Sequence, residues 1–291
     1  MSHEDHHPFE VAAGSVTGRA HALSGKPNQD AVAVRSRGGC LVAVVADGCG
    51  SGAHSEVGAQ LGARIVAELA LGRLAAGERV EAPALWDGVR DDALGALGAA
   101  ARSAGADHAG GVADLFLFTV LGLAIAGDRA VVFGIGDGIF AIERAPLPPD
   151  RGAPEAPRAV DRARIGPFPG NAPPYLGYGL LGGGPRFTLH RALATADLGA
   201  VLLGTDGAAD LDALADRRLP GSPSGEPVGP LSQLWRDDQY FRNRDAIRRR
   251  LALINRDASR PIWAERRIAR EPGLLEDDTT VVAIRRRRAR A

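Results

Sequence analysis

Aspartates recur beside short apolar segments of this 291-residue chain, in a pattern that could bind a metal ion. A single Asp-Gly pair is usually only a turn, in which glycine supplies a positive φ. Recurrence changes this interpretation, because strands of one layered core can end at a common edge and bring their carboxylates together. The five aspartate segments are residues 28–31, 46–48, 136–138, 205–207 and 277–280.

Carboxylates gathered in this way repel one another unless a cation lies among them. Carboxylate oxygens, a backbone carbonyl beside Gly48 and water molecules would form an all-oxygen set of ligands, which suits Mg²⁺ or Mn²⁺. Zinc would instead favour cysteine and histidine, but the only cysteines, Cys40 and Cys49, do not form a Cys-x-x-Cys pair. The residue types therefore predict a magnesium or manganese site.

Apolar runs predict the elements that would position these aspartates. The continuous run at 40–46 is typical of a strand buried on both faces, and apolar residues at helical spacing in 55–71 predict a helix that packs on a sheet. Three runs between 115 and 142 are separated by short turns, which predicts an antiparallel meander. Strands with helices grouped between them favour an α+β layered fold. The expected strands are 10–16, 31–35, 40–46, 115–126, 129–135, 139–142, 198–205 and 279–284, and the expected helices are 55–71, 93–103 and 245–254.

Length and composition favour a single folded domain. The chain is 45% hydrophobic and 24% charged, as globular domains are. No loop separates two halves that each contain a complete set of elements. We therefore expect a disordered N-terminal tail at residues 1–8 and one domain over residues 9–291.

Charge and cysteine content bear on partners and location. Thirty-five basic residues balance thirty-five acidic ones, so we expect no field that draws the protein onto nucleic acid or an anionic membrane. The arginines at 285–290 are interpreted as a solvated charge run. Two cysteines are too few for a disulfide framework, and no segment approaches the ~20 apolar residues that span a bilayer. These features favour a cytoplasmic protein.

In their order and strand context, the five aspartate segments resemble those of the type-2C metal-dependent Ser/Thr protein phosphatases, in the bacterial branch of that family. The resemblance runs from about residue 12 to residue 286. It implies a four-layer α-β-β-α sandwich, in which helices flank two central antiparallel sheets. It also implies that insertions around 145–195 and 212–275 form a flap and a helix that shape substrate choice.

The activity implied by the resemblance is hydrolysis of phosphoserine and phosphothreonine in proteins, by attack of a water molecule that two metal ions activate. By resemblance, Asp47 would bridge two Mn²⁺ or Mg²⁺ ions and the carbonyl of Gly48 would bind one of them. Asp206 and Asp277 would bind the other ion. Asp137 corresponds to the acid that, with Asp206, supports a third and weaker metal in some members. The implied partners are a phosphorylated protein substrate and a cognate Ser/Thr kinase.

Two further positions would contact water and substrate. By resemblance, Asp30 would hold metal-bound water. The arginine that clamps the substrate phosphate, five residues before this aspartate in the family, corresponds to Gly25. Lys26, the only lysine of the chain, could replace it as a point charge, although it lacks the planar fork of arginine. A solvated loop charge is the other interpretation of Lys26.

A second departure from the family falls at Cys49, where animal members have a histidine proposed as a general acid. A thiol is a poor proton donor to a leaving serine oxygen. That proton would then come from metal-bound water, or from His21 or His54 if either reaches the site. Both departures leave an alternative open: a catalytically weak or inactive protein with the phosphatase fold that regulates or scaffolds a partner kinase.

Overall fold

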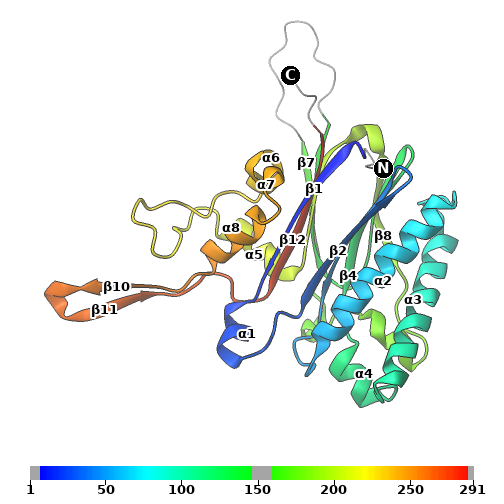
Figure 1. Cartoon of the computed structure of the whole chain (residues 1–291), viewed down its shortest axis with the longest axis horizontal. Helices are drawn as coiled ribbons and strands as arrows, with labels where there is room; N and C mark the ends of the chain where they lie inside the picture. The colour runs from blue at the N-terminus through cyan, green and yellow to red at the C-terminus, as the bar shows by residue number, and fades with distance from the viewer. Residues whose placement is uncertain (1–6, 146–158, 288–291) are drawn as a thin grey trace, which may run out of the picture.

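Two five-stranded sheets form the centre of the computed structural model, which describes residues 7–145 and 159–287 (Figure 1). Every pair of neighbouring strands in both sheets is antiparallel. In order, the first sheet contains β1 (Phe9–Val16), β12 (Thr279–Arg286), β9 (Leu198–Gly204), β6 (Gly138–Arg144) and β7 (Val160–Ile165), and the second contains β2 (Asp30–Arg37), β3 (Cys40–Asp47), β4 (Val120–Ala126), β5 (Arg129–Ile135) and β8 (Thr188–Ala194).

Helices cover the outer face of each sheet, which confirms the predicted α+β sandwich (Figure 1). The second sheet is covered by α2 (Ser55–Ala75), α3 (Pro83–Ser103) and α4 (Ala109–Leu115). The first sheet is covered by α5 (Asp210–Ala213), α6 (Gln233–Arg236), α7 (Gln239–Arg242) and α8 (Ala246–Ile254). None of the helices in the described part of the chain is long and apolar enough to cross a membrane.

Strand β3 shows why a continuous apolar run is needed at the centre of the sandwich. Successive side chains of a strand point to opposite faces of its sheet. Leu41, Ala43 and Val45 pack between the two sheets, whereas Val42 and Val44 pack beneath the helices. Both faces are therefore buried, as the sequence predicted for residues 40–46.

Glycines let helix α2 approach the second sheet closely. A Cβ atom on Gly62 would lie 2.1 Å from Cζ of Phe118, and one on Gly58 would lie 2.4 Å from the carbonyl oxygen of Leu115. Such distances are far inside van der Waals contact, so larger residues would push the helix outward. This close packing holds α2 against the segment that connects α4 to β4.

The predicted meander over 115–142 is wrong at its third strand. β4 and β5 pair as expected, but β6 pairs with β7 and β9 in the other sheet. Gly136 and Gly138 have φ angles of 95° and 132°, which only glycine adopts readily. The turn between them therefore carries the chain from one sheet to the other.

Two expected elements begin far from where they were predicted to begin. Helix α3 begins at Pro83 and not at residue 93, with proline in its first turn, where a missing N–H costs little. The expected strand at 115–126 begins only at Val120, because Leu115 ends helix α4. Phe118 forms an isolated bridge to Gly48 ahead of the strand.

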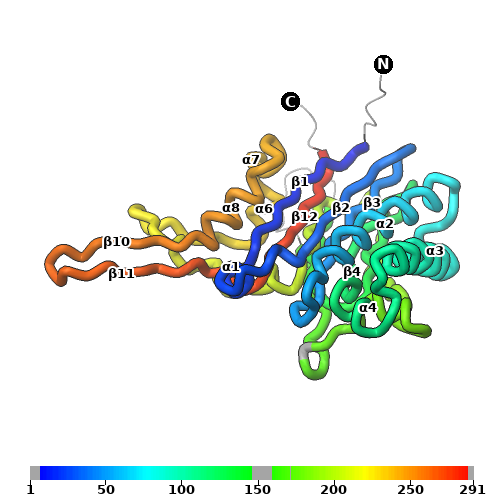
Figure 2. The backbone as a smooth tube through the Cα atoms, turned by 60° about the horizontal axis from the view of Figure 1, so that its bottom comes forward, coloured from blue at the N-terminus to red at the C-terminus, as the bar shows by residue number. Residues whose placement is uncertain are grey.

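A two-stranded arm projects from the sandwich (Figures 1 and 2). It contains β10 (Ala258–Ile262) and β11 (Arg267–Glu271), paired in register from Ala258 opposite Glu271 to Ile262 opposite Arg267. The arm lies within the expected insertion at 212–275, which also contains α6, α7 and α8. The other expected insertion, 145–195, contains β7, β8 and a 3₁₀ segment at Leu176–Leu181, while residues 146–158 lie outside the described part. A flap role for either insertion stays a prediction.

The two ends of the described part of the chain lie side by side next to β1 and β12. Of the expected tail at 1–8, residues 1–6 lie outside the described part, whereas His7 is buried and the N–H of Arg287 donates to the carbonyl of Pro8 at 2.8 Å. Arg285 is also buried, with its Nε 2.7 Å from Oε1 of Glu10. The expectation of a solvated charge run is therefore wrong for Arg285, because β12 holds this residue within the sheet.

Candidate metal centre

Strand pairing in the second sheet places two of the predicted aspartates side by side. Asp30 begins β2, Asp47 ends β3, and the two residues lie directly opposite each other in the register. Gly48 follows in close contact, since its N–H donates to the carbonyl of Gln29 at 3.1 Å. A Cβ atom on Gly48 would lie 2.7 Å from Oγ of Ser55, so a larger residue would displace the loop that follows Asp47.

Strand pairing in the first sheet brings the other three aspartates to the same end. Gly204, the last residue of β9, pairs with Val281 of β12 and with Ile139 of β6. Asp206 lies just after this residue, Asp277 just before β12, and Asp137 just before β6. All five aspartates therefore lie at one end of the sandwich, although they are up to 247 residues apart in the chain.

Thr205 links the two halves of this cluster. Its Oγ1 donates to Oδ2 of Asp30 at 2.8 Å across the sandwich. It also accepts the N–H of Thr280 at 3.1 Å, while the N–H of Thr205 donates to the carbonyl of Thr280 at 3.0 Å. Thr205 therefore fixes the position of Asp30 relative to the end of β9, just before Asp206, and to the start of β12, just after Asp277.

Asp30 is a buried carboxyl with an unused oxygen. Its side chain is 5% exposed, and its Oδ1 has no hydrogen-bond partner. Burial raises the pKa of Asp30 to about 8, against the lowering effect of the hydrogen bond from Thr205, and the charge of Asp278 adds to the increase. A buried polar atom without a partner is costly, so Oδ1 is suited to accept from a bound water molecule.

Like charges also perturb the other carboxyls. Burial and then the negative charges of Asp30, Asp206, Asp277 and Asp137 raise the pKa of Asp47 well above its ordinary value. The four neighbouring charges that contribute to this shift are all negative. An uncompensated carboxylate surrounded by others is the electrostatic environment that a divalent cation relieves.

Asp137 and Asp277 show the same effect more weakly. Burial, followed by the charge of Asp206, raises the pKa of Asp137 to about 6, and its buried Oδ1 has no partner. Burial likewise raises the pKa of Asp277, again with a contribution from Asp206. Two unpartnered carboxylate oxygens and the all-oxygen donor set thus fit a hard divalent cation.

The carboxylates are gathered but not equally close. Among residues 7–145 and 159–287, one set of three His, Cys, Asp or Glu side chains has its ligand atoms within 4.8 Å of one another: His21, Asp277 and Asp278. Asp47, Asp206 and Asp277 are not such a set, so the oxygens of at least two of these residues lie more than 4.8 Å apart. The structure therefore supports their common location and leaves their role as joint ligands a prediction.

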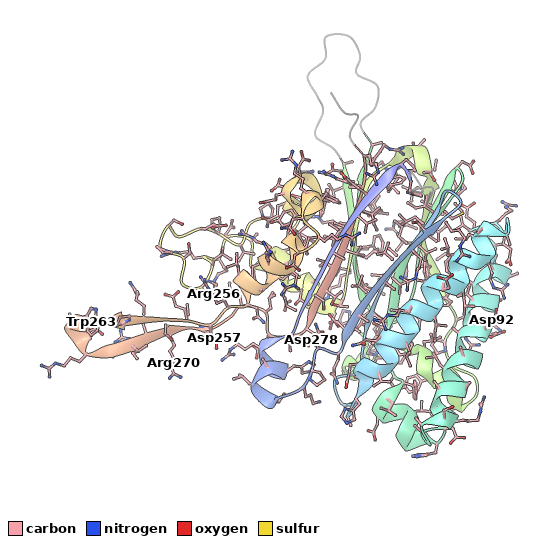
Figure 3. The ribbon with its side chains drawn as sticks, viewed as in Figure 1. Asp92, Arg256, Asp257, Trp263, Arg270 and Asp278 are labelled. Carbon is pink, nitrogen blue, oxygen red and sulfur yellow. The ribbon has the colours of Figure 1, made fainter. Side chains whose placement is uncertain are left out.

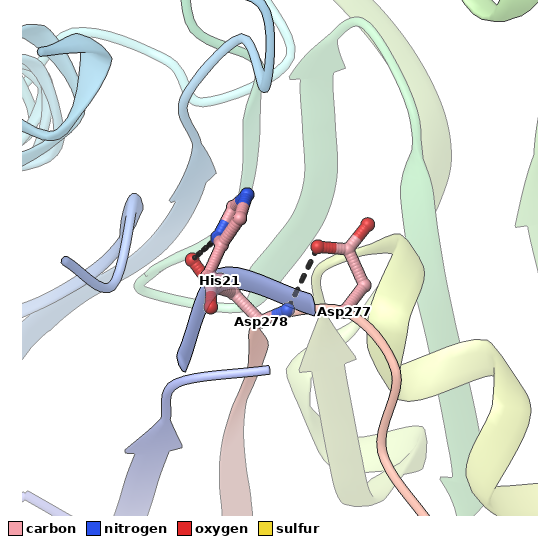
Figure 4. A group of neighbouring side chains, drawn as sticks. All are labelled: His21, Asp277 and Asp278. Atoms are coloured by element: carbon pink, nitrogen blue, oxygen red, sulfur yellow. Dashed lines mark hydrogen bonds and ion pairs between the residues drawn. The ribbon is translucent and has the colours of Figure 1, made fainter. Parts of the chain in front are cut away.

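Asp278 is a structural residue that the sequence reasoning did not single out. It is 2% exposed and accepts the N–H groups of Gly18 at 2.7 Å and Gln29 at 2.6 Å. Its Oδ2 lies 2.8 Å from Nδ1 of His21 in helix α1 (Arg19–Ser24), as Figure 4 shows. Asp278 thereby ties α1 and the start of β2 to the start of β12. Its place in the Asp-Asp-Thr-Thr segment was the available signal.

The two candidate histidines lie in different environments. An ionised carboxylate can only accept hydrogen bonds. Nδ1 of His21 therefore carries the proton that it shares with Oδ2 of Asp278, and Nε2 is left available. His54 is exposed, and its Nδ1 lies 3.3 Å from Glu56. His21 has a ligand atom within 4.8 Å of the predicted metal ligand Asp277.

The two departures from the family pattern also lie beside the cluster. Gly25 ends helix α1 in the left-handed conformation, with φ of 70°, and nothing lies within 4 Å of a Cβ placed there. Lys26 donates from Nζ to the carbonyl of Gly50 at 2.7 Å. The only lysine is therefore held against the loop that follows Asp47 and Gly48.

Cys49 is buried in that loop. Burial of the thiol works against ionisation, but hydrogen bonds with Ser51 and Tyr175 outweigh it and hold the pKa of Cys49 below its ordinary value. Burial and the contact with Cys49 raise the pKa of Tyr175, and the charge of Asp47 contributes. Tyr175 comes from the insertion at 145–195, so sequence spacing could not place it beside Cys49.

Known proteins match this chain in sequence over part of its length and in fold over nearly all of it. The family model described as protein phosphatase 2C matches residues 17–146, which include Asp30, Asp47 and Asp137. A search of curated proteins finds no matching sequence.

Solved structures with the same fold are distant in sequence. The catalytic domain of the serine threonine protein phosphatase PstP, in complex with two manganese ions, is 19% identical, with 95% of this chain and 97% of that chain covered and a TM-score of 0.50. Stp1 from Staphylococcus aureus is 12% identical, with 95% and 94% covered and a TM-score of 0.51. Serine-threonine phosphatase 2C from Toxoplasma gondii is 13% identical, with 95% and 94% covered and a TM-score of 0.53. The match of residues 17–146 to the family model, and a fold shared over 95% of the chain, confirm the resemblance to the type-2C protein phosphatases.

Proposed function

We propose that this protein is a metal-dependent phosphatase that hydrolyses phosphoserine and phosphothreonine in proteins. The observation that carries the proposal is the gathering of five aspartates at one end of the sandwich, where Asp30 and Asp137 each have a buried carboxylate oxygen without a partner. A protein that needed only the fold would gain nothing from this repulsion. The proposal includes a phosphorylated protein as substrate, a cognate kinase as partner and a cytoplasmic location.

The metal ligands in this proposal come from three strand ends and one turn. Asp47 would bridge two Mn²⁺ or Mg²⁺ ions, with the carbonyl of Gly48 on one and with Asp206 and Asp277 on the other, while Asp137 would support a third. When bound, such ions supply a water molecule activated for in-line attack and offset the charge of the phosphate. Because burial and like charges raise the pKa of Asp47, binding of a cation there would be linked to the ionisation of this carboxyl.

Two residues of this chain would act on water and substrate. Oδ1 of Asp30 would accept a hydrogen bond from the attacking water, while Oδ2 stays fixed by Thr205. Lys26, held over the loop at Gly50, would contact the phosphate as a single positive charge in place of the arginine missing at Gly25. One point charge gives a weaker and less oriented contact than a bidentate guanidinium.

His21 is the residue best placed to protonate the leaving serine or threonine oxygen. Asp278 orients its ring through Nδ1, which leaves Nε2 free to carry and release a proton. Cys49 occupies the family's histidine position but is buried against Ser51. His21 would therefore supply from helix α1 what the loop after Asp47 lacks.

A second candidate function is a regulatory or scaffold protein for a kinase, with weak activity or none. Gly25 and Cys49 favour it, since both positions lack the family's polar side chain. The five carboxylates disfavour it. The two candidates differ in whether the purified protein turns over substrate.

Manganese-dependent hydrolysis of p-nitrophenyl phosphate tests the proposal. Asp47→Asn and Asp206→Asn should each lower turnover by about 100-fold or more, beyond the ~10–100-fold typical of residues that only support a metal site. Without metal both variants should melt at or above the wild-type temperature, and both should lose the stabilisation that Mn²⁺ gives the wild type. The matched control is Asp107→Asn, which replaces an exposed aspartate in the loop after α3 and should behave as the wild type. Full activity in Asp47→Asn would refute the metal site, and stabilisation by Mn²⁺ without turnover would favour the scaffold.

A further inference from the structure

A groove lies at the base of the arm, beside the segment that leads to Asp277. It has a volume of about 510 Å³ and is lined on one side by residues of the loop after α5, including Arg217 and Arg218. Arg270 and Glu271 of β11 line the other side, together with Pro272. The groove is therefore only a few residues along the chain from a predicted metal ligand.

Positive charge predominates over the groove and the arm. Residues 216–218 and 256–271 contain seven arginines and four acids. Three of the four acids have partners in the described structure: Asp257 accepts the N–H of Gly273, Glu271 that of Gly221, and Glu265 pairs with Arg267. Asp216 is exposed in the groove wall. These contacts fix the acids in place, and the two segments keep a net charge of +3 (7 − 4).

Several of the arginines are free to bind a partner. Among the described residues, Arg217, Arg260, Arg266 and Arg270 are exposed and make no side-chain hydrogen bond or ion pair. An exposed guanidinium keeps its charge at any physiological pH and offers a planar fork that matches a carboxylate. The surface is therefore complementary to an acidic chain.

The arm also exposes large apolar side chains. Trp263 lies near the outer end of the arm (Figure 3) and is 84% exposed. Ile268 is 64% exposed. Two-stranded hairpins bury little apolar surface of their own, and exposed tryptophan beside arginine is the composition of residues that carry binding energy at protein interfaces. This combination indicates contact with a polypeptide.

The base of the arm is fixed while its outer part projects. The carboxylate of Glu271 accepts the N–H of Gly221 at 2.7 Å, and that of Asp257 accepts the N–H of Gly273 at 2.8 Å. Arg256 donates to the carbonyl of Pro220 at 2.8 Å. These bonds hold Arg270 at the groove and point the arm away from the sandwich (Figure 2). A rigid base lowers the entropy lost on binding.

We propose that the groove and the arm bind an acidic segment that flanks the phosphorylated residue of a protein substrate. The proposal rests on the proposed function and adds to it the class of substrate. Arg217, Arg218 and Arg270 would contact the carboxylates, and Trp263 would cover an apolar part of the same segment. An extended segment of eight residues spans up to ~28 Å, long enough to run along the arm.

Paired phosphothreonine peptides test this selectivity. One peptide carries eight aspartates and glutamates beside the phosphothreonine, and the other carries serines and glycines in their place. The acidic peptide should have a KM about tenfold lower, and this advantage should shrink as salt screens the charges. The double variant R217E/R270E should remove the advantage, with kcat within about twofold of wild type. R64E/R102E makes the same charge change on α2 and α3 and should change neither constant.

Quenching of tryptophan fluorescence by iodide gives a readout that needs no turnover. Trp86 and Trp235 are each 2% exposed, so the quenchable tryptophan is Trp263. An unphosphorylated acidic peptide should protect Trp263 in the wild type and in R64E/R102E, but not in R217E/R270E. W263A should lose the quenchable signal and raise the KM of the acidic peptide about threefold or more, with unchanged hydrolysis of p-nitrophenyl phosphate.

The outcomes separate this proposal from the proposed function. Protection of Trp263 without any phosphatase activity would retain the docking surface and refute the enzyme. Activity with equal KM for both peptides, and no protection, would refute the docking surface alone. Protection by phosphatidylserine vesicles but not by the acidic peptide would also refute it, and would assign the arm to a membrane surface.

Discussion

Replacing Asp30 by asparagine should stabilise the metal-free protein, and do so increasingly as the pH rises. The Asp30 carboxyl has a pKa of about 8 in the folded protein, chiefly because it is buried, against an ordinary value of 3.8. Between these values the unfolded chain is ionised at this residue and the folded chain is not. The folded state therefore loses stability as the pH rises from about 4 through about 8.

The size of the effect follows from the two pKa values. One pKa unit corresponds to about 1.36 kcal/mol, so ionisation in the unfolded state alone costs the wild type up to about 4 kcal/mol at pH 7. The substituted asparagine would stay neutral in both states and could still accept from Thr205. Its amide group would lie where Oδ1 now has no partner, at a cost of about 1 kcal/mol that does not vary with pH. The advantage of the variant should thus grow by about 3 kcal/mol between pH 5 and pH 7.5.

Urea unfolding with a chelator at several pH values measures this difference. Asp30→Asn is compared with the wild type and with Asp107→Asn, whose stability should follow the wild type at every pH. Added Mn²⁺ should reverse the order at pH 7.5, because the wild type binds the ion more tightly and is stabilised by it. Parallel stability curves for Asp30→Asn and the wild type would refute the conclusion that Asp30 is buried and protonated in the metal-free protein.

Three further substitutions test other parts of the account. Lys26→Ala should raise the KM for a phosphopeptide about threefold or more with little change in kcat, and steady-state kinetics that show no change would assign Lys26 to the solvent. His21→Gln should lower kcat for phosphoserine peptides by about 100-fold, within the range for a general acid. It should lower kcat for p-nitrophenyl phosphate much less, because that leaving group needs no proton. Equal losses of kcat on both substrates would point to a structural role. Gly62→Ala should destabilise the protein by about 1–3 kcal/mol in thermal unfolding, since its methyl group would overlap Phe118. Gly72→Ala in the same helix has nothing within 4 Å and should stabilise it by about 0.5–1 kcal/mol; the same sign for both would contradict the packing of α2.

Much of the fold could be predicted because many of its helices and strands have a recognisable local pattern of apolar residues. The buried run at 40–46 became β3, and the helical spacing at 55–71 became the first part of α2. The predicted bounds were wrong where a local pattern is ambiguous, as at Leu115, which ends helix α4 although it continues an apolar run. The partner of β6 could not be predicted, because a Gly-Asp-Gly turn permits both a hairpin and a crossing between sheets.

The sequence alone determined which residues could bind a cation, because carboxylates at strand ends are a matter of residue type and spacing. Only the tertiary structure decided how these residues are held: Thr205 bonded to Asp30 across the sandwich, Asp278 bonded to His21, and Tyr175 beside Cys49. It also decided that the arginines of residues 256–271 lie on a projecting arm beside a groove. The physical reason is that pKa shifts, unpartnered oxygens and surface charge depend on distances between segments far apart in the chain, which no local pattern records.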